Sequence, residues 1–316
     1  MNENRKWLWI IIAVVVVVFF TCGGCALLGL VSTMIEMPSA TTGNAVAIIE
    51  LKGTIVSGSG PSRLQSGVVY AENVIEDLRR AEGDPAVRAV VIEISSPGGG
   101  VVASADIHAA VREMTKPVVA TMVDTGASGA YYVAAGTQRI LVRPSTITGS
   151  IGVIATFVNA DGLFDTLGIE QQVVKTGPHK DQGSLYRPLT EEELEMLQTM
   201  LEESLDRFVD AIVEGRDMPE QQVRQVADGR IMSGQRAIEL GLADEVGRLD
   251  DAVRIAAELG GIVGEPRRIH YAPERLSFFD LLLQTLASSV PTEVALVDRV
   301  LGDQMAPTLQ YLYVRP

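Results

Sequence analysis

The stretch Ala89-Val-Val-Ile-Glu-Ile-Ser-Ser-Pro-Gly-Gly-Gly100 decides the fold class of this chain. Its apolar first half, Ala89–Ile94, is typical of a buried strand, and the glycine-rich turn after it opens a helix over Val102–Met114. Glycines let a backbone approach a ligand closely, and the N-terminus of the next helix supplies oriented N–H groups. Such a turn can hold a phosphate or an oxyanion, or it can be a tight strand–helix connection and nothing more.

Strand-like and helix-like segments alternate on both sides of this stretch. We expect a strand at Ala45–Leu51, a helix at Ala71–Ala81, a strand at Pro117–Met122, a helix start at Ser128–Ala135 and a short strand at Ile140–Val142. This alternation predicts an α/β fold with a mainly parallel sheet.

A long amphipathic helix is predicted after Thr190, which forms a capping box with Glu193. Its apolar stripe, at spacings of three and four residues, consists of Leu194, Leu197, Leu201, Leu205, Phe208 and Ile212. The opposite side of the helix is acidic, and acidic faces do not favour a membrane surface. We therefore expect the stripe to pack on the sheet or on a neighbouring subunit.

The N-terminal segment is predicted to cross a membrane. No charged residue occurs from Trp7 to Ile35, and a helix needs only about 20 apolar residues to span the hydrocarbon core. Arg5 and Lys6 precede the run, so the N-terminus should stay cytoplasmic and the rest of the chain should be extracytoplasmic. A cleaved secretory signal is the alternative, but its apolar core would be about 7–15 residues long and no A-x-A site follows.

The composition disfavours several classes of site. The net charge of -14 repels phosphate backbones, so nucleic acid is not an expected partner. The two cysteines, Cys22 and Cys25, lie in the apolar run, where we interpret them as small buried residues rather than a redox or zinc pair. The three histidines are scattered, so we expect neither a metal site nor a cofactor.

A second glycine-rich turn, Thr125-Gly-Ala-Ser-Gly-Ala-Tyr-Tyr132, contains a candidate nucleophile. Gly126 and Gly129 allow a sharp bend that would expose the hydroxyl of Ser128, and the N–H of Gly129 could point at a developing oxyanion. A serine at this place can also be a simple helix N-cap.

A serine hydroxyl needs a base to act as a nucleophile. His179 has no obvious acidic partner in the sequence, whereas its neighbour Lys180 can serve if it is desolvated enough to be unprotonated part of the time. Lys180 can equally be an ordinary exposed loop residue.

Five sequence blocks occur here in the order in which they occur in a known family. They are Ser96-Pro-Gly-Gly, Ala127-Ser-Gly-Ala-Tyr-Tyr, Thr148-Gly-Ser-Ile-Gly-Val, Lys175-Thr-Gly-Pro-His-Lys-Asp and Gly229-Arg-Ile-Met-Ser-Gly, the last followed by Ala237-Ile-Glu-Leu-Gly-Leu-Ala-Asp-Glu-Val-Gly. From about Ala45 to Leu259 the chain therefore resembles signal peptide peptidase A, a family of serine peptidases with a Ser-Lys dyad, in its half-length form.

The resemblance implies a role for each matching residue. Ser128 would be the nucleophile, Lys180 the general base, and Ser150 the hydroxyl that orients the lysine. The implied oxyanion-hole amides are those of Gly98 or Gly99 and of Gly129. Ala130 stands where the family usually has a glycine, and we expect little effect from this difference.

The resemblance also implies an architecture and a substrate class. The expected fold is caseinolytic-protease/crotonase-like, preceded by one transmembrane helix, and half-length members form ring- or dome-like homo-oligomers with the dyad shared between subunits. Substrates would be apolar peptides, remnant signal peptides in particular, at the cell (inner) membrane, with no cofactor. The predicted divisions are a cytoplasmic N-terminus (1–6), the transmembrane helix (7–35), a linker (36–44), the Ser-Lys peptidase domain (45–265) and a C-terminal extension (266–316).

Two functions from other classes compete with a peptidase. A membrane scaffold could keep the fold without the chemistry, but the joint presence of Ser128, Ser150 and Lys180 argues against it. A crotonase-type acyl-CoA enzyme would share the oxyanion turn, but an acidic, membrane-anchored protein is a poor binder of a cytosolic polyanion.

The end of the chain, Tyr311-Leu-Tyr-Val-Arg-Pro316, is apolar and has no acidic side chain. Such a tail could lie in a peptide groove by strand addition and restrain the enzyme. Alternatively, it could simply pack on the surface, as chain ends usually do.

Overall fold

The computed structural model describes residues 43–60, 67–271 and, as backbone only, 310–312. The predicted N-terminus (1–6), transmembrane helix (7–35) and most of the linker (36–44) lie outside these residues. Within the described part of the chain, no helix combines the length and apolarity needed to cross a membrane.

The main sheet has eight strands, six of which follow one another in the order β10-β7-β6-β4-β1-β11. These six are β1 (Ala45–Lys52), β4 (Val87–Ser96), β6 (Val118–Ala127), β7 (Arg139–Val142), β10 (Glu245–Val246) and β11 (Arg267–His270), and every neighbouring pair is parallel. The predicted α/β class with a mainly parallel sheet is confirmed. The centre of the sheet forms because β1, β4 and β6 are rich in Val, Ile and Ala, which suit strands that are covered on both faces.

Two short strands extend the main sheet at the carboxyl end of β6. β8 (Ile147–Gly149) runs parallel to the last residues of β6, and β9 (Ile231–Ser233) pairs with β8 in the antiparallel sense. A second, four-stranded sheet has the order β12-β5-β2-β3. Its members are β2 (Thr54–Val56), β3 (Val68–Tyr70), β5 (Gly98–Gly100) and β12 (Gln310–Leu312).

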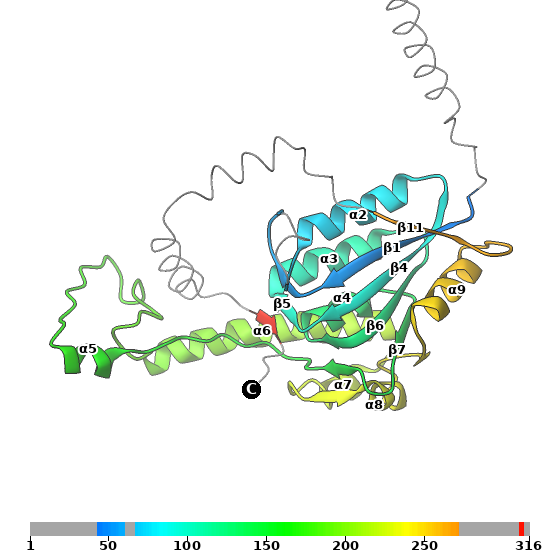
Figure 1. The fold of residues 1–316 in the computed structure, drawn as a ribbon. Coiled ribbons are helices and arrows are strands. Elements are labelled where there is room, and N and C mark those ends of the chain that lie inside the picture. The colour runs from blue at the N-terminus through cyan, green and yellow to red at the C-terminus, as the bar shows by residue number, and fades with distance from the viewer. Residues whose placement is uncertain (1–42, 61–66, 272–309, 313–316) are drawn as a thin grey trace, which may run out of the picture. The chain divides into compact units, whose positions relative to one another are not determined.

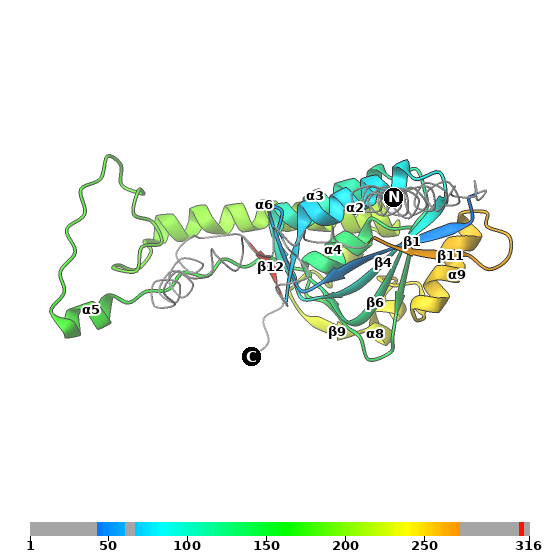
Figure 2. The same cartoon turned by 45° about the horizontal axis from the view of Figure 1, so that its top comes forward.

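Helices cover both faces of the main sheet (Figures 1 and 2). The larger core cluster joins the sheet to α2 (Ala71–Gly83), α3 (Val101–Glu113), α4 (Gly129–Ala135) and the second half of α6 (Glu191–Arg216). The smaller cluster packs α9 (Leu249–Leu259) on the opposite face. The short helices are α5 (Asp161–Leu167), α7 (Glu220–Arg224) and α8 (Gly234–Glu239).

Helix α6 begins with the predicted capping box, in which Thr190 and Glu193 exchange side-chain and backbone hydrogen bonds. Only the second half of its predicted apolar stripe is in the core, where Phe208 and Ile212 are buried, whereas Leu194 is 52% exposed. The ring of Phe208 packs on Tyr132 of α4 with 4.9 Å between centroids, so α6 packs on a helix beside the nucleophile turn.

Two strands lie in the region predicted as an extension (266–316). β11 pairs with β1, so Arg267–His270 belong to the edge of the main sheet. β12 pairs with β5, which places Gln310–Leu312 against the first glycine-rich turn. We predicted an extension with no evident role in the sheet, and the pairing of β11 with β1 corrects that interpretation.

Candidate active site

Ser128 sits on the sharp turn between β6 and α4, as predicted. Its backbone has φ 55° and ψ -122°, and a positive φ is unfavourable for a residue other than glycine. Two backbone hydrogen bonds hold the turn: the N–H of Ser128 donates to Gly149 O at 2.8 Å, and its carbonyl accepts from Tyr132 N at 2.9 Å. The side chain is 1% exposed, and Oγ makes no hydrogen bond with any described residue.

The first oxyanion candidate, Gly129, begins α4. The first N–H groups of a helix have no acceptor within that helix, so the amide beside Ser128 is available to a ligand. An amide next to the nucleophile is where an acyl-transfer site needs a donor.

The other oxyanion candidates lie on the turn that follows β4. Ser96 pairs with Gly126 across β4 and β6, which brings this turn beside the nucleophile turn. Gly98 has φ 100° and donates its N–H to Ser96 Oγ at 3.1 Å. A Cβ on Gly99 would lie 1.9 Å from Ile55 O, so only glycine fits there.

Ser150 is the immediate neighbour of Ser128 in space. Ala127 and Gly149 are paired across β6 and β8, and each serine is the next residue after one of them. Ser150 is buried, has φ 51° and donates its N–H to Arg230 O at 2.7 Å. Adjacent strands lie about 4.8 Å apart, so the backbones of the two serines lie close together at the ends of β6 and β8.

Lys180 lies elsewhere, in the segment between β8 and α6 that carries α5 (Figures 1 and 2). Its side chain is exposed and has no hydrogen bond or ion pair with the described residues. Neighbouring side chains have partners: Lys175 Nζ lies 2.7 Å from Asp181 Oδ1, and His179 lies 3.8 Å from Glu192 and from Glu193. Sequence reasoning missed these acidic neighbours of His179, because they belong to the first turn of α6.

The structure does not bring Lys180 and Ser128 of one chain together. Ion pairs of Arg187 with Asp181 and Glu193 hold this loop at the first turn of α6, whereas α6 meets α4 at Phe208. At about 1.5 Å per residue, α6 rises about 22 Å between those two positions. A lysine side chain does not span that gap.

The sequence profile of peptidase family S49 matches residues 110–262, which include Ser128, Ser150 and Lys180. A Synechocystis protein named "Putative protease slr0021" is 35% identical over 260 residues, which make up 79% of this chain and 89% of that protein. The chain belongs to peptidase family S49.

Other relatives of this S49 chain carry the name predicted from its sequence blocks. "Putative signal peptide peptidase SppA" of Enterococcus faecium is 37% identical over 203 residues, covering 63% of this chain and 59% of that protein. "Serine protease SPPA, chloroplastic" of Arabidopsis thaliana is 32% identical over 259 residues, covering 81% of this chain and 38% of that protein. The resemblance to signal peptide peptidase A is confirmed, and the low coverage of the longer relative fits a half-length form.

Among solved structures, a point mutant of ClpP1 from Listeria monocytogenes aligns with a TM-score of 0.43 and 18% identity, over 65% of this chain and 94% of that chain.

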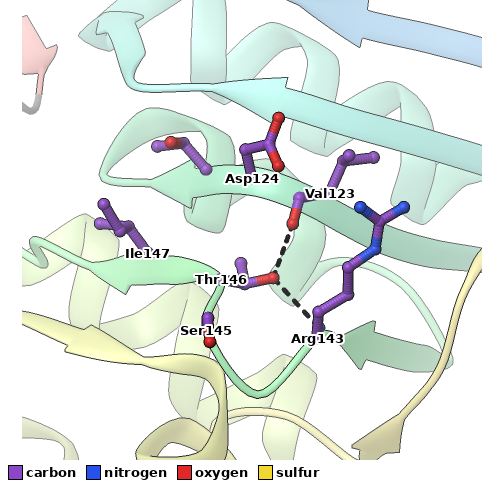
Figure 3. A pocket seen from close by; sticks show the side chains of 7 residues that line it. Val123, Asp124, Arg143, Ser145, Thr146 and Ile147 are labelled. Carbon is purple, nitrogen blue, oxygen red and sulfur yellow. Dashed lines mark hydrogen bonds between the residues drawn. The ribbon is translucent and has the colours of Figure 1, made fainter.

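A pocket of about 260 Å³ lies beside the nucleophile strand of this S49 chain (Figure 3). Its lining residues are Val123, Asp124, Thr125, Arg143, Ser145, Thr146 and Ile147. The hydroxyl of Thr146 donates to Val123 O at 2.7 Å and accepts from Arg143 N at 3.0 Å. Ser128 does not line this pocket, but these bonds fix the start of β8 and hence the position of Ser150.

Near the end of this S49 chain, Gln310–Leu312 form strand β12. β12 runs antiparallel to β5, with Tyr311 opposite Gly99 and Leu312 opposite Gly98. β12 also contacts α4, the helix that begins beside Ser128. β12 therefore pairs with the glycine-rich turn that contains the candidate oxyanion residues Gly98 and Gly99.

Proposed function

We propose that this S49 chain is a membrane-anchored serine endopeptidase that cleaves apolar peptides, such as remnant signal peptides after their release. Ser128 is the nucleophile, and Lys180 of a neighbouring subunit is the general base. The observation that carries the proposal is the state of Ser128 Oγ, which is buried on a turn with positive φ and makes no hydrogen bond with a described residue. A hydroxyl held in this way is available both to a base and to a substrate carbonyl.

The chemistry follows from the groups around this hydroxyl. Ser128 Oγ attacks the scissile carbonyl carbon while the unprotonated amine of Lys180 takes the hydroxyl proton. The carbonyl oxygen becomes an oxyanion that accepts from the N–H of Gly129 and of Gly99, since the N–H of Gly98 already donates to Ser96 Oγ. The lysine then gives its proton to the leaving amine, and a water molecule that it deprotonates hydrolyses the acyl-enzyme. Ser150 lies where it can orient the amine of the lysine.

A dyad shared between subunits is supported by the surface around Lys180. The segment between β8 and α6, with the first turns of α6, exposes large apolar side chains: Ile154, Val158, Leu163, Leu167, Ile169, Val173, Val174, Leu194, Met196 and Met200. Many exposed apolar side chains in one segment favour a surface that packs on another protein. Packing it on a second copy would bury Lys180, and burial favours the unprotonated amine that the mechanism needs.

The membrane anchor and the substrate class rest on the sequence. The uncharged run from Trp7 to Ile35, preceded by Arg5 and Lys6, supports a single-pass protein of the cell (inner) membrane with an extracytoplasmic catalytic domain. An enzyme tethered there meets apolar peptides released from the membrane. Membership of a peptidase family disfavours the crotonase-type alternative.

Covalent labelling separates a peptidase from a scaffold of the same fold. The full-length chain in detergent is treated with a peptidyl fluorophosphonate and its intact mass is measured. We expect one adduct per chain in the wild type and in Ser145→Ala, which removes an exposed serine nearby, and none in Ser128→Ala. An unlabelled wild-type oligomer, or an adduct that persists in Ser128→Ala, would contradict the proposal.

A further inference from the structure

Lys180 lies in a loop without regular secondary structure, so something other than a helix or strand must set its position. The next residue, Asp181, is held firmly. Its Oδ1 accepts from Arg187 Nη2 at 2.6 Å and from Lys175 Nζ at 2.7 Å. Lys175 Nζ also donates to Pro178 O at 2.8 Å, and this bond closes the loop that carries Lys180.

Arg187 connects this loop to the first turn of α6. Its Nη1 donates to Glu193 Oε2 at 2.8 Å, and its Nη2 donates to Glu193 Oε1 at 2.7 Å, a bidentate pair. Glu193 is itself fixed, because its side chain is 1% exposed and its Oε2 accepts from Thr190 N at 2.9 Å in the capping box. The guanidinium of Arg187 thus connects Asp181, the neighbour of Lys180, to the first turn of α6. The second half of α6 lies in the core.

We propose that Arg187 is a positioning residue for the base, which fixes the loop of Lys180 and keeps the carboxylate of Asp181 from pairing with the lysine. The inference rests on the proposed function of Lys180. An aspartate beside a catalytic lysine would otherwise stabilise the ammonium, which cannot accept a proton. With Arg187 and Lys175 on the same oxygen, the charge of Asp181 is already compensated.

The network is charged throughout the pH range in which a lysine base would act. Hydrogen bonds from Arg187 and then Lys175 hold the pKa of Asp181 well below its usual range. Hydrogen bonds from Arg187 and from the backbone of Thr190 lower the pKa of Glu193 to about 2. Both folded pKa values lie below the unfolded ones, so the stabilisation is present above about pH 4 and is lost only as the pH falls through the folded values.

The charged groups that face this loop come from the loop itself and from α6. They are Lys175, His179, Asp181, Arg187, Glu192 and Glu193. Removing Arg187 leaves Lys175 as the partner of Asp181 and leaves Glu193 buried without its strongest partner. The loop should then move, because Lys175 alone does not attach Asp181 to α6, and the carboxylate of Asp181 should be able to approach Lys180.

The test compares the pH profiles of four full-length variants with that of the wild type, using one small peptide substrate. Arg187→Gln should lower kcat at least about tenfold, leave KM within about twofold, and move the half-maximal pH upward by about one unit. The double variant Arg187→Gln/Asp181→Asn should return the half-maximal pH to the wild-type value. Arg187→Lys, which keeps the charge, should also keep that value even where kcat falls.

The matched control is Arg224→Gln. Arg224 also lies between two carboxylates, those of Asp206 on α6 at 2.8 Å and Glu220 at 2.7 Å, but away from the lysine loop. Its pH profile should equal that of the wild type. A fall in kcat for Arg187→Gln with an unmoved half-maximal pH, or a shift that Asp181→Asn does not reverse, would overturn the inference. Activity retained in Lys180→Met would refute instead the proposed function on which it rests.

Discussion

The two halves of the proposed dyad have opposite surroundings. Ser128 is buried at the end of a central strand, and its turn is held by backbone hydrogen bonds to β8 and within α4. Lys180 is exposed in an irregular loop that is held by ion pairs of Lys175, Asp181, Arg187 and Glu193. The core of one chain therefore fixes the position of Ser128, whereas Lys180 lies exposed on the surface. An exposed position is what we expect of a residue that acts in the site of a neighbouring chain.

The largest effect should come from the nucleophile. Ser128→Ala should lower kcat/KM by about 10⁴–10⁶-fold, because the attacking oxygen is gone. Circular dichroism and size-exclusion elution should match those of the wild type, since the side chain makes no hydrogen bond with a described residue. Ser145→Ala serves as the control and should keep full activity. Turnover at the wild-type rate by folded Ser128→Ala would show that Ser128 is not the nucleophile.

The base should give the next largest effect. Lys180→Met should lose at least about 100-fold in kcat, and the wild-type rate should rise with pH from neutral to alkaline, because only the unprotonated amine accepts a proton. Lys52→Met, which removes an exposed lysine from the carboxyl end of β1, is the control. His179→Ala should retain activity, and full activity in Lys180→Met together with loss in His179→Ala would transfer the role of base to the histidine.

The C-terminal strand should have the smallest effect. Deleting residues 309–316 should lower KM for a small peptide a few-fold, because β12 occupies the edge of β5 that an extended substrate would use. The measurement needs a truncated protein with the wild-type oligomeric state. An unchanged KM in such a protein would leave β12 as a packing strand without a regulatory role.

The sequence predicted the strands and the turn around Ser128 well. Apolar β-branched runs identify β1, β4 and β6, and the glycines around Ser128 identify its turn, because these features depend on local chemistry. The proximity of Ser150 to Ser128 depends instead on the pairing of β8 with β6, which no local pattern specifies. The role of Ser150 was predicted from the family resemblance and not from its spacing in the sequence.

The loop of Lys180, the C-terminal strands and the packing of α6 were harder to predict, because they depend on contacts between distant parts of the chain. β11 is a short strand that exists through its pairing with β1, so its polar sequence gave no signal, whereas strand addition by the tail was one of the two hypotheses for β12. The stripe on α6 predicted an apolar face, but periodicity cannot tell that Phe208 lies in the core while Leu194 faces outward. Arg187 sits in an aperiodic loop, and its role became visible only when the structure placed it between Asp181 and Glu193.

The central claim is that the dyad forms between subunits, and mixed oligomers test it most directly. Full-length Ser128→Ala and Lys180→Ala chains, each inactive alone, are mixed, exchanged and verified as hybrids by differential tags. If Lys180 of one chain serves Ser128 of the next, hybrid interfaces contain one intact dyad, and activity should return to about a quarter to a half of the wild-type level. Verified hybrids that stay as inactive as the single variants would contradict the account and place both residues of the dyad within one chain.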